Sequence, residues 1–532
     1  MILILGLKLL LALPVFASNE CDKKLTLEQI QELSTRVDRE RLIQWGKKAL
    51  SKKAKNPEAF QKEFYDLIFS LESNNQLEAS LGDLIKMVRQ SEYGEKIKNY
   101  PDTMLIAQLS MVLKAELLAR GYHQGYRFPT WPEKMAKIDE ILKTLPPTKD
   151  FLDEEFKTTF KKITNQVFYN YNEFTFLGEP YHSLTKRVEL IRRAKEIFTI
   201  MVWGWHDDTI GKLMADEVIA AHKRGKAKGY IMVDYLTSLK PGYNQELKRM
   251  AEAGVPVIYF KGKENPFFGL HIKEYNVDYW QTLGGGRNIG EHYLSPAQWM
   301  DSDYLITGGG LTGIENPNFF AQHWNEQVEQ QGLSFNKLKL IEPISEGDLD
   351  GLVATVAQIP SALSYDPIHL LVLYGLKNAK TKFDVMNAYY ILDPIMKRET
   401  EAALKRGVPV RIFTNSAESI DEPIITYLIM KSVREMYRAG AQIYLKKGKT
   451  LHTKQWGIDN MAISGTYNNH PRSTFYEAEK VHVFLGPVAV EQINENFENG
   501  ITDAVLVTSE EQIPLPESPE MDLLFSLFSN QL

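Results

Sequence analysis

The stretch HIKEYNVD at residues 271–278 returns later in the chain as HTKQWGID at residues 452–459. In each copy a histidine and a lysine stand two residues apart, and an aspartate follows five residues after the lysine. Side chains two residues apart on an extended strand project to the same face. We therefore expect each copy to present an imidazole and an ammonium group together, so that both bind one phosphate.

A glycine-containing turn that ends in asparagine follows each copy. It is Gly284-Gly285-Gly286-Arg287-Asn288 after the first copy and Gly465-Thr466-Tyr467-Asn468 after the second. Such turns let backbone amides and an asparagine side chain approach an oxyanion closely. Asn288 and Asn468 are therefore candidate phosphate-binding residues, with turn formation alone as the alternative explanation.

Two histidines in one site can divide the steps of a phosphoryl transfer between them. One attacks phosphorus to give a covalent phosphohistidine, while the other protonates the leaving oxygen and later deprotonates the incoming nucleophile. The lysines and asparagines would stabilise the charge that grows in the transition state. The predicted catalytic residues are His271, Lys273, Asp278, His452, Lys454 and Asp459, and we expect neither a metal nor another cofactor.

A reactive imidazole needs an acceptor that fixes its second ring nitrogen. The candidates for this orienting role are Asp303 after the first copy and Glu479 or Glu477 after the second. The motif aspartates Asp278 and Asp459 stand near strand ends. We expect these two to brace local structure.

The segments that lead to the two motifs have the same order of elements, which indicates an internal duplication. The pattern predicts helix, strand, helix and strand at 209–224, 230–234, 244–253 and 255–260, and again at 394–406, 408–413, 421–438 and 441–445. Alternating strands and helices predict an α/β fold with mainly parallel sheets covered by helices. Two such halves, related by a pseudo-twofold axis, would bring both motifs to one cleft.

The length of 532 residues predicts two to four structural units. Helical periodicity from about residue 25 to 170 indicates an all-helical region before the duplicated part. The predicted segments are a signal peptide at 1–17, a helical domain at 18–175, repeat 1 at 176–345, a linker at 346–366, repeat 2 at 367–510 and a tail at 511–532.

Composition and the amino terminus bear on partners and location. A net charge of −6 argues against a protein that embraces long nucleic acid, which requires a surplus of Lys and Arg. The apolar run MILILGLKLLLALPVFA at 1–17 predicts export to the periplasm or medium, with a buried first helix or a short membrane anchor as alternatives. Cys21 is the only cysteine, so an intrachain disulfide is impossible.

Several segments resemble the phospholipase D superfamily, whose members carry paired His-x-Lys-x4-Asp motifs, and are similar in detail to bacterial cardiolipin synthases and related phosphatidyltransferases. They are GGRNIGEHYL (285–294), DSDYLITG (301–308), TNSAESID (414–421), LHTKQWGID (451–459) and SGTYNNHPRSTFYEAE (464–479). The resemblance spans about 180–510. It implies a phosphatidyl-enzyme intermediate without a metal, with His271 as the nucleophile and His452 as the general acid. It also favours Glu479 as the imidazole partner, because Glu477 stands where the family commonly has asparagine.

These observations favour a phosphatidyltransferase or phospholipase D that acts on phospholipids, with peripheral membrane contact and without a nucleic-acid partner. Both motifs lie in one chain, so the active site requires no oligomer. The alternatives are a secreted phosphodiesterase or nuclease with the same motifs, and a lipid-binding protein whose pocket only holds a phosphodiester. Export would separate this chain from cardiolipin synthases held at the inner membrane and favours hydrolysis. The sequence leaves the acceptor and the headgroup open.

Overall fold

A computed structural model describes Gln44 and residues 57–90, 102–120, 122, 131–263, 268–296, 299–342, 351–360, 365–422 and 425–514. The chain divides into two compact units, one of residues 1–131 with 516–532 and one of residues 132–515. The predicted signal peptide, residues 346–350 and 361–364 of the predicted linker, and the tail beyond residue 514 lie outside the described residues.

The first unit contains the helices α3 (Pro57–Ser73), α4 (Leu77–Arg89) and α5 (Asp102–Ala119). Apolar side chains from all three are buried, including Leu71, Ile85 and Leu109. This helical unit contains none of the predicted site residues. Nowhere in the described part of the chain does a helix combine the length and the apolarity needed to cross a bilayer.

Two further helices, α6 (Trp131–Thr144) and α7 (Glu154–Thr164), pack on the second α/β half through α14 (Pro367–Asn378). Lys377 donates to the carbonyl of Leu142 at 2.7 Å, and the Tyr374 ring stacks on Phe156. The predicted end of the helical domain at residue 175 therefore lies beyond the start of the second unit at residue 132. Helical periodicity identifies a helix, but it does not say on which domain that helix packs.

The first α/β half contains a seven-stranded sheet of order β1-β8-β7-β6-β2-β3-β4. Its strands are β1 (Glu173–Leu177), β2 (Ile197–Val202), β3 (Lys228–Asp234), β4 (Val257–Phe260), β6 (Glu274–Val277), β7 (Gln281–Gly285) and β8 (Asp303–Thr307). Only β2, β3 and β4 run parallel, and the other pairs are antiparallel. The prediction of a mainly parallel sheet is wrong. Crossover helices join β2 to β3 and β3 to β4, so these strands run parallel, whereas a short turn joins β6 to β7 and makes them antiparallel.

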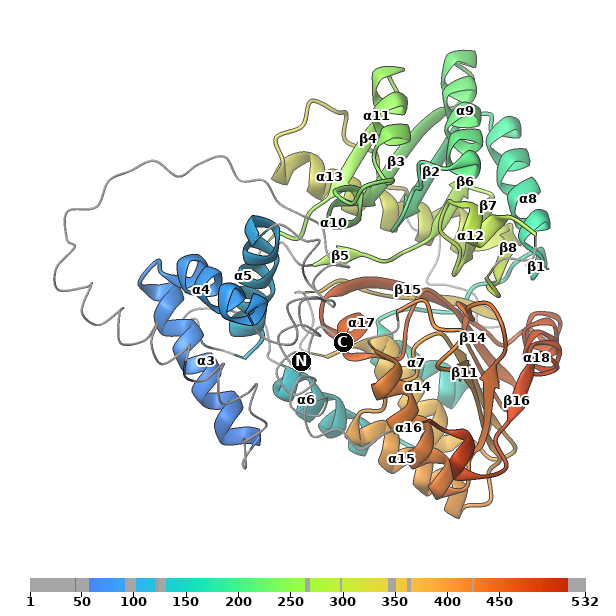
Figure 1. Cartoon of the computed structure of the whole chain (residues 1–532). Coiled ribbons are helices and arrows are strands. Elements are labelled where there is room, and N and C mark those ends of the chain that lie inside the picture. Colours follow the sequence, from blue (N-terminus) through green and yellow to red (C-terminus); the bar gives the residue numbers. More distant parts are fainter. Residues whose placement is uncertain are drawn as a thin grey trace. The chain divides into compact units, whose positions relative to one another are not determined.

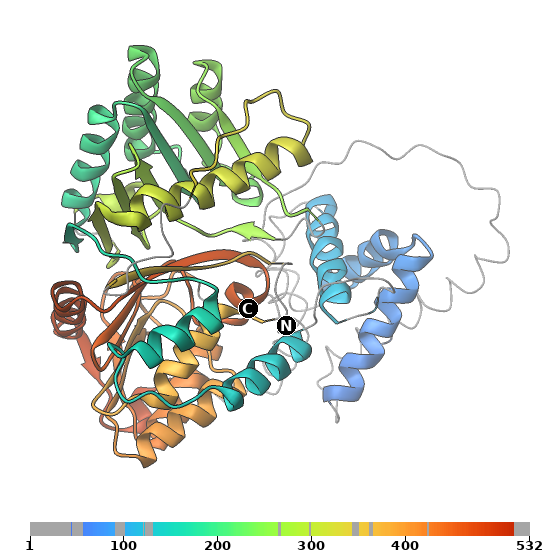
Figure 2. The ribbon, with the colours of Figure 1, turned by 180° about the vertical axis from the view of Figure 1, so that it is seen from behind.

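Helices cover both faces of this sheet (Figure 2). Successive side chains of β2 and β3 point to opposite faces, and both faces are apolar. Ile200 and Ile231 pack beneath α8 (Pro180–Arg193), α9 (Thr209–Arg224) and α11 (Gln245–Glu252). Met201 and Met232 pack on the other face with Trp324 of α13 (Asn316–Gln330). The predicted α/β class is confirmed.

The second half repeats the strand order as β9-β15-β14-β13-β10-β11-β12 and adds β16 (Ala504–Leu506) at the edge. Its strands are β9 (Val353–Gln358), β10 (Phe383–Asn387), β11 (Val410–Asn415), β12 (Gln442–Lys446), β13 (Lys454–Ile458), β14 (Met461–Gly465) and β15 (Glu477–Phe484). The helices α14, α15 (Pro394–Lys405), α16 (Thr426–Ala439) and α18 (Pro487–Ile501) accompany them. The equal strand order in both halves shows the duplication in the fold itself, and β9 lies within the segment predicted as a linker.

The two halves are joined by backbone pairing at both motifs. The short strand β5 (Gly269–Leu270) runs parallel beside β15, as Figure 1 shows. The N–H of His271 donates to the carbonyl of Ala478 at 2.9 Å, and the N–H of His452 donates to the carbonyl of Met300 at 2.7 Å. Each motif histidine is thereby fixed against a strand or loop of the opposite half.

Candidate active site

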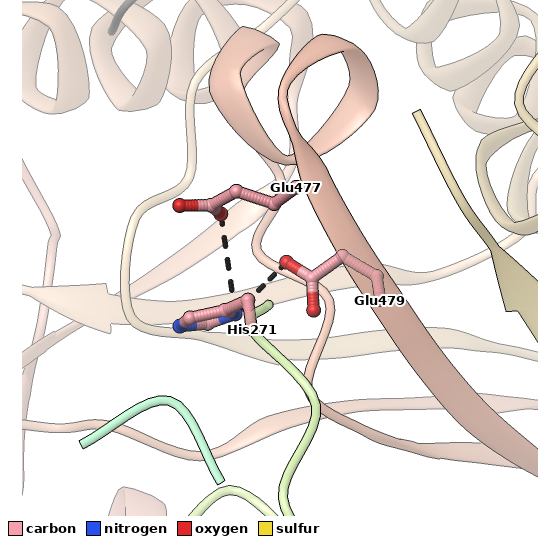
Figure 3. Close-up of side chains that lie close together, drawn as sticks. All are labelled: His271, Glu477 and Glu479. Carbon is pink, nitrogen blue, oxygen red and sulfur yellow. Dashed lines mark hydrogen bonds and ion pairs between the residues drawn. The ribbon is translucent and has the colours of Figure 1, made fainter. Parts of the chain in front are cut away.

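His271 is oriented by a carboxylate from the other half. Its Nδ1 lies 2.9 Å from Oε1 of Glu479, which stands on β15 (Figure 3). The hydroxyls of Ser473 and Thr466 donate to the same carboxylate at 2.6 and 2.5 Å. Glu479 is therefore the direct partner of this imidazole, whereas Glu477 lies farther from it, at 4.0 Å.

His452 has the reciprocal arrangement. Its Nδ1 lies 2.6 Å from Oδ2 of Asp301, a residue of the first half. The rings of Tyr293 and Trp299 flank the imidazole at centroid distances of 5.1 and 5.6 Å. Asp301 follows Met300, as Glu479 follows Ala478, so the two carboxylates occupy equivalent positions. Each half thus supplies the acid for the histidine of the other half.

Asp303 is a predicted imidazole partner, but among the described residues it makes no hydrogen bond to either motif histidine. It is fully buried and accepts hydrogen bonds from Arg187 at 2.8 Å and from Arg287 at 3.2 Å. Asp301 and Asp303 are two residues apart in an extended segment, so their side chains are expected on the same face. Their spacing from the motif therefore could not indicate which of the two orients a histidine. The prediction of Asp303 is therefore wrong, and sequence reasoning missed Asp301.

The two motif lysines are buried beside the histidines. Lys273 donates to the carbonyl of His271 at 2.6 Å, and Lys454 donates to the carbonyl of His452. Burial lowers the pKa of Lys273 to about 7 and that of Lys454 to about 8, although nearby carboxylates oppose the shift. An anion bound between these lysines would favour their charged forms.

The electrostatics agree with a single centre formed by both motifs. Burial lowers the pKa of His271 well below its usual value, and the charges of Lys273, Lys454 and His452 lower it further. Two of these three groups belong to the second motif. The structure therefore brings the four predicted side chains together from both halves of one chain.

The predicted phosphate-binding asparagines are also buried near this centre. Asn288 accepts a hydrogen bond from the N–H of Gly204 at 3.1 Å. Its Nδ2 and the Oδ1 of Asn468 are buried without a hydrogen-bond partner among the described residues. Each amide thus retains hydrogen-bonding capacity, and Nδ2 of Asn288 is a donor that suits an anionic oxygen.

The glycines before these asparagines permit close approach to the acid-bearing segments. A Cβ on Gly286 would lie 2.1 Å from Oδ1 of Asp301, and one on Gly465 would lie 2.4 Å from the carbonyl of Lys480. Thr466 stands in the second turn where Gly286 stands in the first, and its hydroxyl bonds to the orienting carboxylate. The two turns therefore hold their acids by different means.

The motif aspartates support the backbone. Asp278 and Asp459 both have positive φ values, 51° and 49°, in the turn that ends β6 or β13. Asp278 accepts the N–H groups of residues 195–197, and Asp459 accepts those of residues 380–382. These contacts fix the chain where β2 and β10 begin. These contacts match the predicted bracing role. Within the described part of the chain, neither carboxylate makes a hydrogen bond to a motif histidine.

The two orienting acids differ in their electrostatics. Burial alone would raise the pKa of Asp301, but the positive charges of His452, Lys454 and Arg287 lower it to about 2. Burial raises the pKa of Glu479 well above its usual value, and the charge of neighbouring Glu477 raises it further. Asp301 is therefore a firm anion, whereas burial and Glu477 make a negative charge on Glu479 less favourable.

One nitrogen of His271 and one carboxylate oxygen each of Glu477 and Glu479 lie within 4.8 Å of one another, a spacing that could hold a cation. The oxygens of Glu477 accept from Arg472 at 2.9 Å and from Ser473 at 3.0 Å. Both Glu479 oxygens accept hydroxyl groups as well. A fixed guanidinium and several hydroxyl donors suit imidazole orientation better than they suit a cation.

Comparisons with known proteins agree with this geometry. Residues 372–501 match the family model described as cardiolipin synthase, PLD-like domain. Cardiolipin synthase 2 of Staphylococcus epidermidis is 23% identical over 396 residues, which cover 70% of this chain and 78% of that protein. Cardiolipin synthase C of Escherichia coli is 22% identical over 408 residues, covering 62% of this chain and 84% of that protein.

The fold has a solved counterpart in a phosphatidylserine synthase of Haemophilus influenzae, with a TM-score of 0.57 and 14% identity over 71% of this chain and 100% of that one. The duplicated fold and the paired motifs resemble those of phospholipase D-type proteins. By its family-model match and its relatives, the chain is similar to the phospholipase D superfamily and, within it, to the cardiolipin synthases.

Proposed function

We propose that this protein is a phosphatidyltransferase of the cardiolipin synthase type, which acts on phospholipids through a covalent phosphohistidine. The observation that carries the proposal is the reciprocal pairing of His271 with Glu479 and of His452 with Asp301. Two buried lysines complete the site. The names of the similar proteins support a phospholipid as the substrate.

In the first step, His271 attacks the phosphorus of a phosphodiester. Glu479 holds Nδ1, so Nε2 is the attacking atom, and the low pKa of His271 that burial causes keeps the ring neutral and nucleophilic. The N–P bond forms as the bond from phosphorus to the headgroup oxygen breaks. His452 gives its proton to that oxygen. Burial lowers the pKa of His452, and the anion Asp301 opposes this shift and favours the imidazolium.

In the second step, an incoming hydroxyl gives its proton to His452 and attacks phosphorus, and the N–P bond breaks. Lys273 and Lys454 stabilise the non-bridging oxygens in both steps, with Asn288 as an additional donor. A lipid alcohol such as phosphatidylglycerol would give cardiolipin. Water would give phosphatidic acid.

The apolar run at residues 1–17 supports export to the periplasm or the medium. Under this proposal the protein meets its substrate at a membrane surface, where it makes peripheral contact. Its substrate would then be the phospholipid of an outward-facing leaflet.

The test is to incubate the purified protein with vesicles of phosphatidylethanolamine and phosphatidylglycerol, or with DNA, and to identify the products by mass spectrometry. Cardiolipin is the expected product, phosphatidic acid would indicate a phospholipase D, and short oligonucleotides would support the nuclease alternative. His271→Ala and His452→Ala should each lower turnover by about 10⁴-fold or more, and the double variant should lose little beyond that.

The matched control is His182→Ala, which removes an exposed histidine of α8 and should leave turnover unchanged. Turnover that survives in the double variant would show that the reaction centre lies elsewhere.

A further inference from the structure

The two halves differ where the loops after β3 and β11 approach the reaction centre. These strands end in equivalent residues, Asp234 and Asn415, each of which accepts the backbone N–H of the residue before the motif histidine. Six residues farther on, the first loop has Lys240 and the second has Asp421. A cation and an anion therefore occupy equivalent positions in the two halves.

Asp421 is held on the His452 side. The hydroxyl of Tyr389 lies 2.9 and 2.8 Å from its two carboxylate oxygens. Burial lowers the pKa of both His452 and Lys454, and the negative charge of Asp421 opposes this shift. The first half has Gly204 at the position of Tyr389, so it has no phenol that holds a carboxylate there.

Lys240 lies on the side of the other histidine. Its ammonium is 5.2 Å from the ring of Trp203, and that ring is in edge contact with His271 at 6.0 Å. Lys240 thus lies on the side of the nucleophile, where burial lowers its pKa and the charge of Glu422 opposes this shift, and Asp421 lies on the side of the general acid.

The proposed mechanism places the headgroup oxygen at His452, because this histidine must protonate it. The rest of the headgroup then extends away from phosphorus on the side where Asp421 stands. An ionised carboxylate only accepts hydrogen bonds, and so recognises groups that donate them. Glu422, the next residue, adds a second carboxylate. Burial raises the pKa of Tyr243 to about 12, and the negative charge of Glu422 contributes to this rise.

Resting on the proposed function, we propose that Asp421 recognises the alcohol headgroup by accepting hydrogen bonds from its terminal donors. Those donors are the hydroxyls of a glycerol headgroup or the ammonium of an ethanolamine headgroup. The same contact would orient an incoming headgroup hydroxyl toward His452 in the second step.

The experiment compares Asp421→Asn with the wild-type protein on vesicles of phosphatidylglycerol, phosphatidylethanolamine or phosphatidylpropanol. Propanol matches glycerol in length but has no terminal donor. The greater basicity of its leaving oxygen cancels, because wild type and variant are compared on the same lipid. The variant should lose about 30-fold in kcat/KM on the first two lipids and less than about threefold on phosphatidylpropanol. A larger loss on phosphatidylethanolamine would identify the ammonium as the main donor, a larger loss on phosphatidylglycerol would identify the hydroxyls, and equal losses would show that Asp421 accepts from both.

The matched control is Glu418→Gln, which alters an exposed carboxylate of the same loop and should change none of the three rates. An equal loss on all three lipids would overturn the proposal, because Asp421 would then act through His452. No loss on any lipid would overturn it as well. If wild type converts none of these lipids, or if His271→Ala still does, the proposed function itself fails.

Discussion

The two α/β halves share a strand order, a motif and an asparagine turn, but they treat their histidines differently. His271 is oriented by Glu479, whose pKa is raised by burial and by the charge of Glu477. His452 is oriented by Asp301, whose pKa is lowered to about 2 by nearby positive charge despite its burial. The fold supplies two equivalent imidazoles, and the residues around them supply the difference between a nucleophile and an acid.

The largest expected effect separates the two orienting acids. Asp301→Asn removes a firm negative charge from the imidazolium of His452 and should lower kcat/KM by about 10³-fold. Glu479→Gln retains an acceptor at a carboxyl whose negative charge burial and Glu477 already disfavour, so the loss should be about 10-fold. Steady-state kinetics on the product assay above measures both. Equal losses would show that the two histidine–acid pairs are electrostatically alike.

A second comparison tests the turns that hold these acids. Gly286→Ala places a Cβ where Asp301 now lies, at 2.1 Å from its Oδ1, and should lower kcat/KM by about 10²-fold. Thr466→Ala removes one of the hydroxyls that donate to Glu479 and should cost less than about 10-fold. A greater loss for Thr466→Ala would mean that close packing at Gly286 is not what positions Asp301.

The lysines predict how substrate affinity depends on pH. Burial lowers the pKa of Lys273 to about 7 and of Lys454 to about 8, so each ammonium loses its proton as the pH rises through that value. The affinity for a non-hydrolysable phosphonate lipid should therefore be highest below pH 7. It should begin to fall as the pH rises through 7 and fall more steeply as the pH rises through 8, by at most about tenfold per pH unit for each proton lost.

Lys273→Arg, which stays protonated, should remove the lower of the two transitions and leave the upper one. Binding isotherms measured from pH 6 to pH 9 check this. An affinity that does not change over this range would contradict the assignment of the lysines to the phosphate.

The smallest effects on activity belong to the motif aspartates. Asp459→Ala leaves three backbone N–H groups without their acceptor and should lower the free energy of unfolding by about 2 kcal/mol. The loss from Asp278→Ala should be similar. Asp459→Asn keeps an acceptor and tolerates the positive φ, so it should lose less than about 1 kcal/mol. Urea unfolding measures stability, and a collapse of kcat/KM at unchanged stability would indicate a catalytic role.

Much of the molecule follows from the sequence, because a repeated motif constrains both halves at once. The His-x-Lys pairs predicted one phosphate centre, and the element order predicted two equivalent α/β halves. Position after the second motif left Glu479 and Glu477 as candidate imidazole partners, the family resemblance favoured Glu479, and the hydrogen bond of His271 matches Glu479. These features depend on local spacing, which a sequence displays directly.

Other features depend on contacts between distant segments. Arg187 and Arg287 bind the carboxylate of Asp303, whereas the carboxylate of Asp301 pairs with His452. The antiparallel half of each sheet follows from short turns that replace crossover helices. Periodicity also did not reveal that α6 and α7 pack on the second repeat. Apart from the strands joined by short turns, these partners lie far from their counterparts in the sequence.

The central claim is that the two halves have different chemical roles, with the covalent bond on His271. A lipid with a p-nitrophenol headgroup needs no proton for its leaving oxygen, so the His452→Ala variant should form the intermediate and then fail to release it. The reaction would be quenched at alkaline pH, and the phosphatidylated peptide would be identified by mass spectrometry. We predict the adduct on His271 in this variant and none in His271→Ala. An adduct on His452 in the His271→Ala variant would contradict this account.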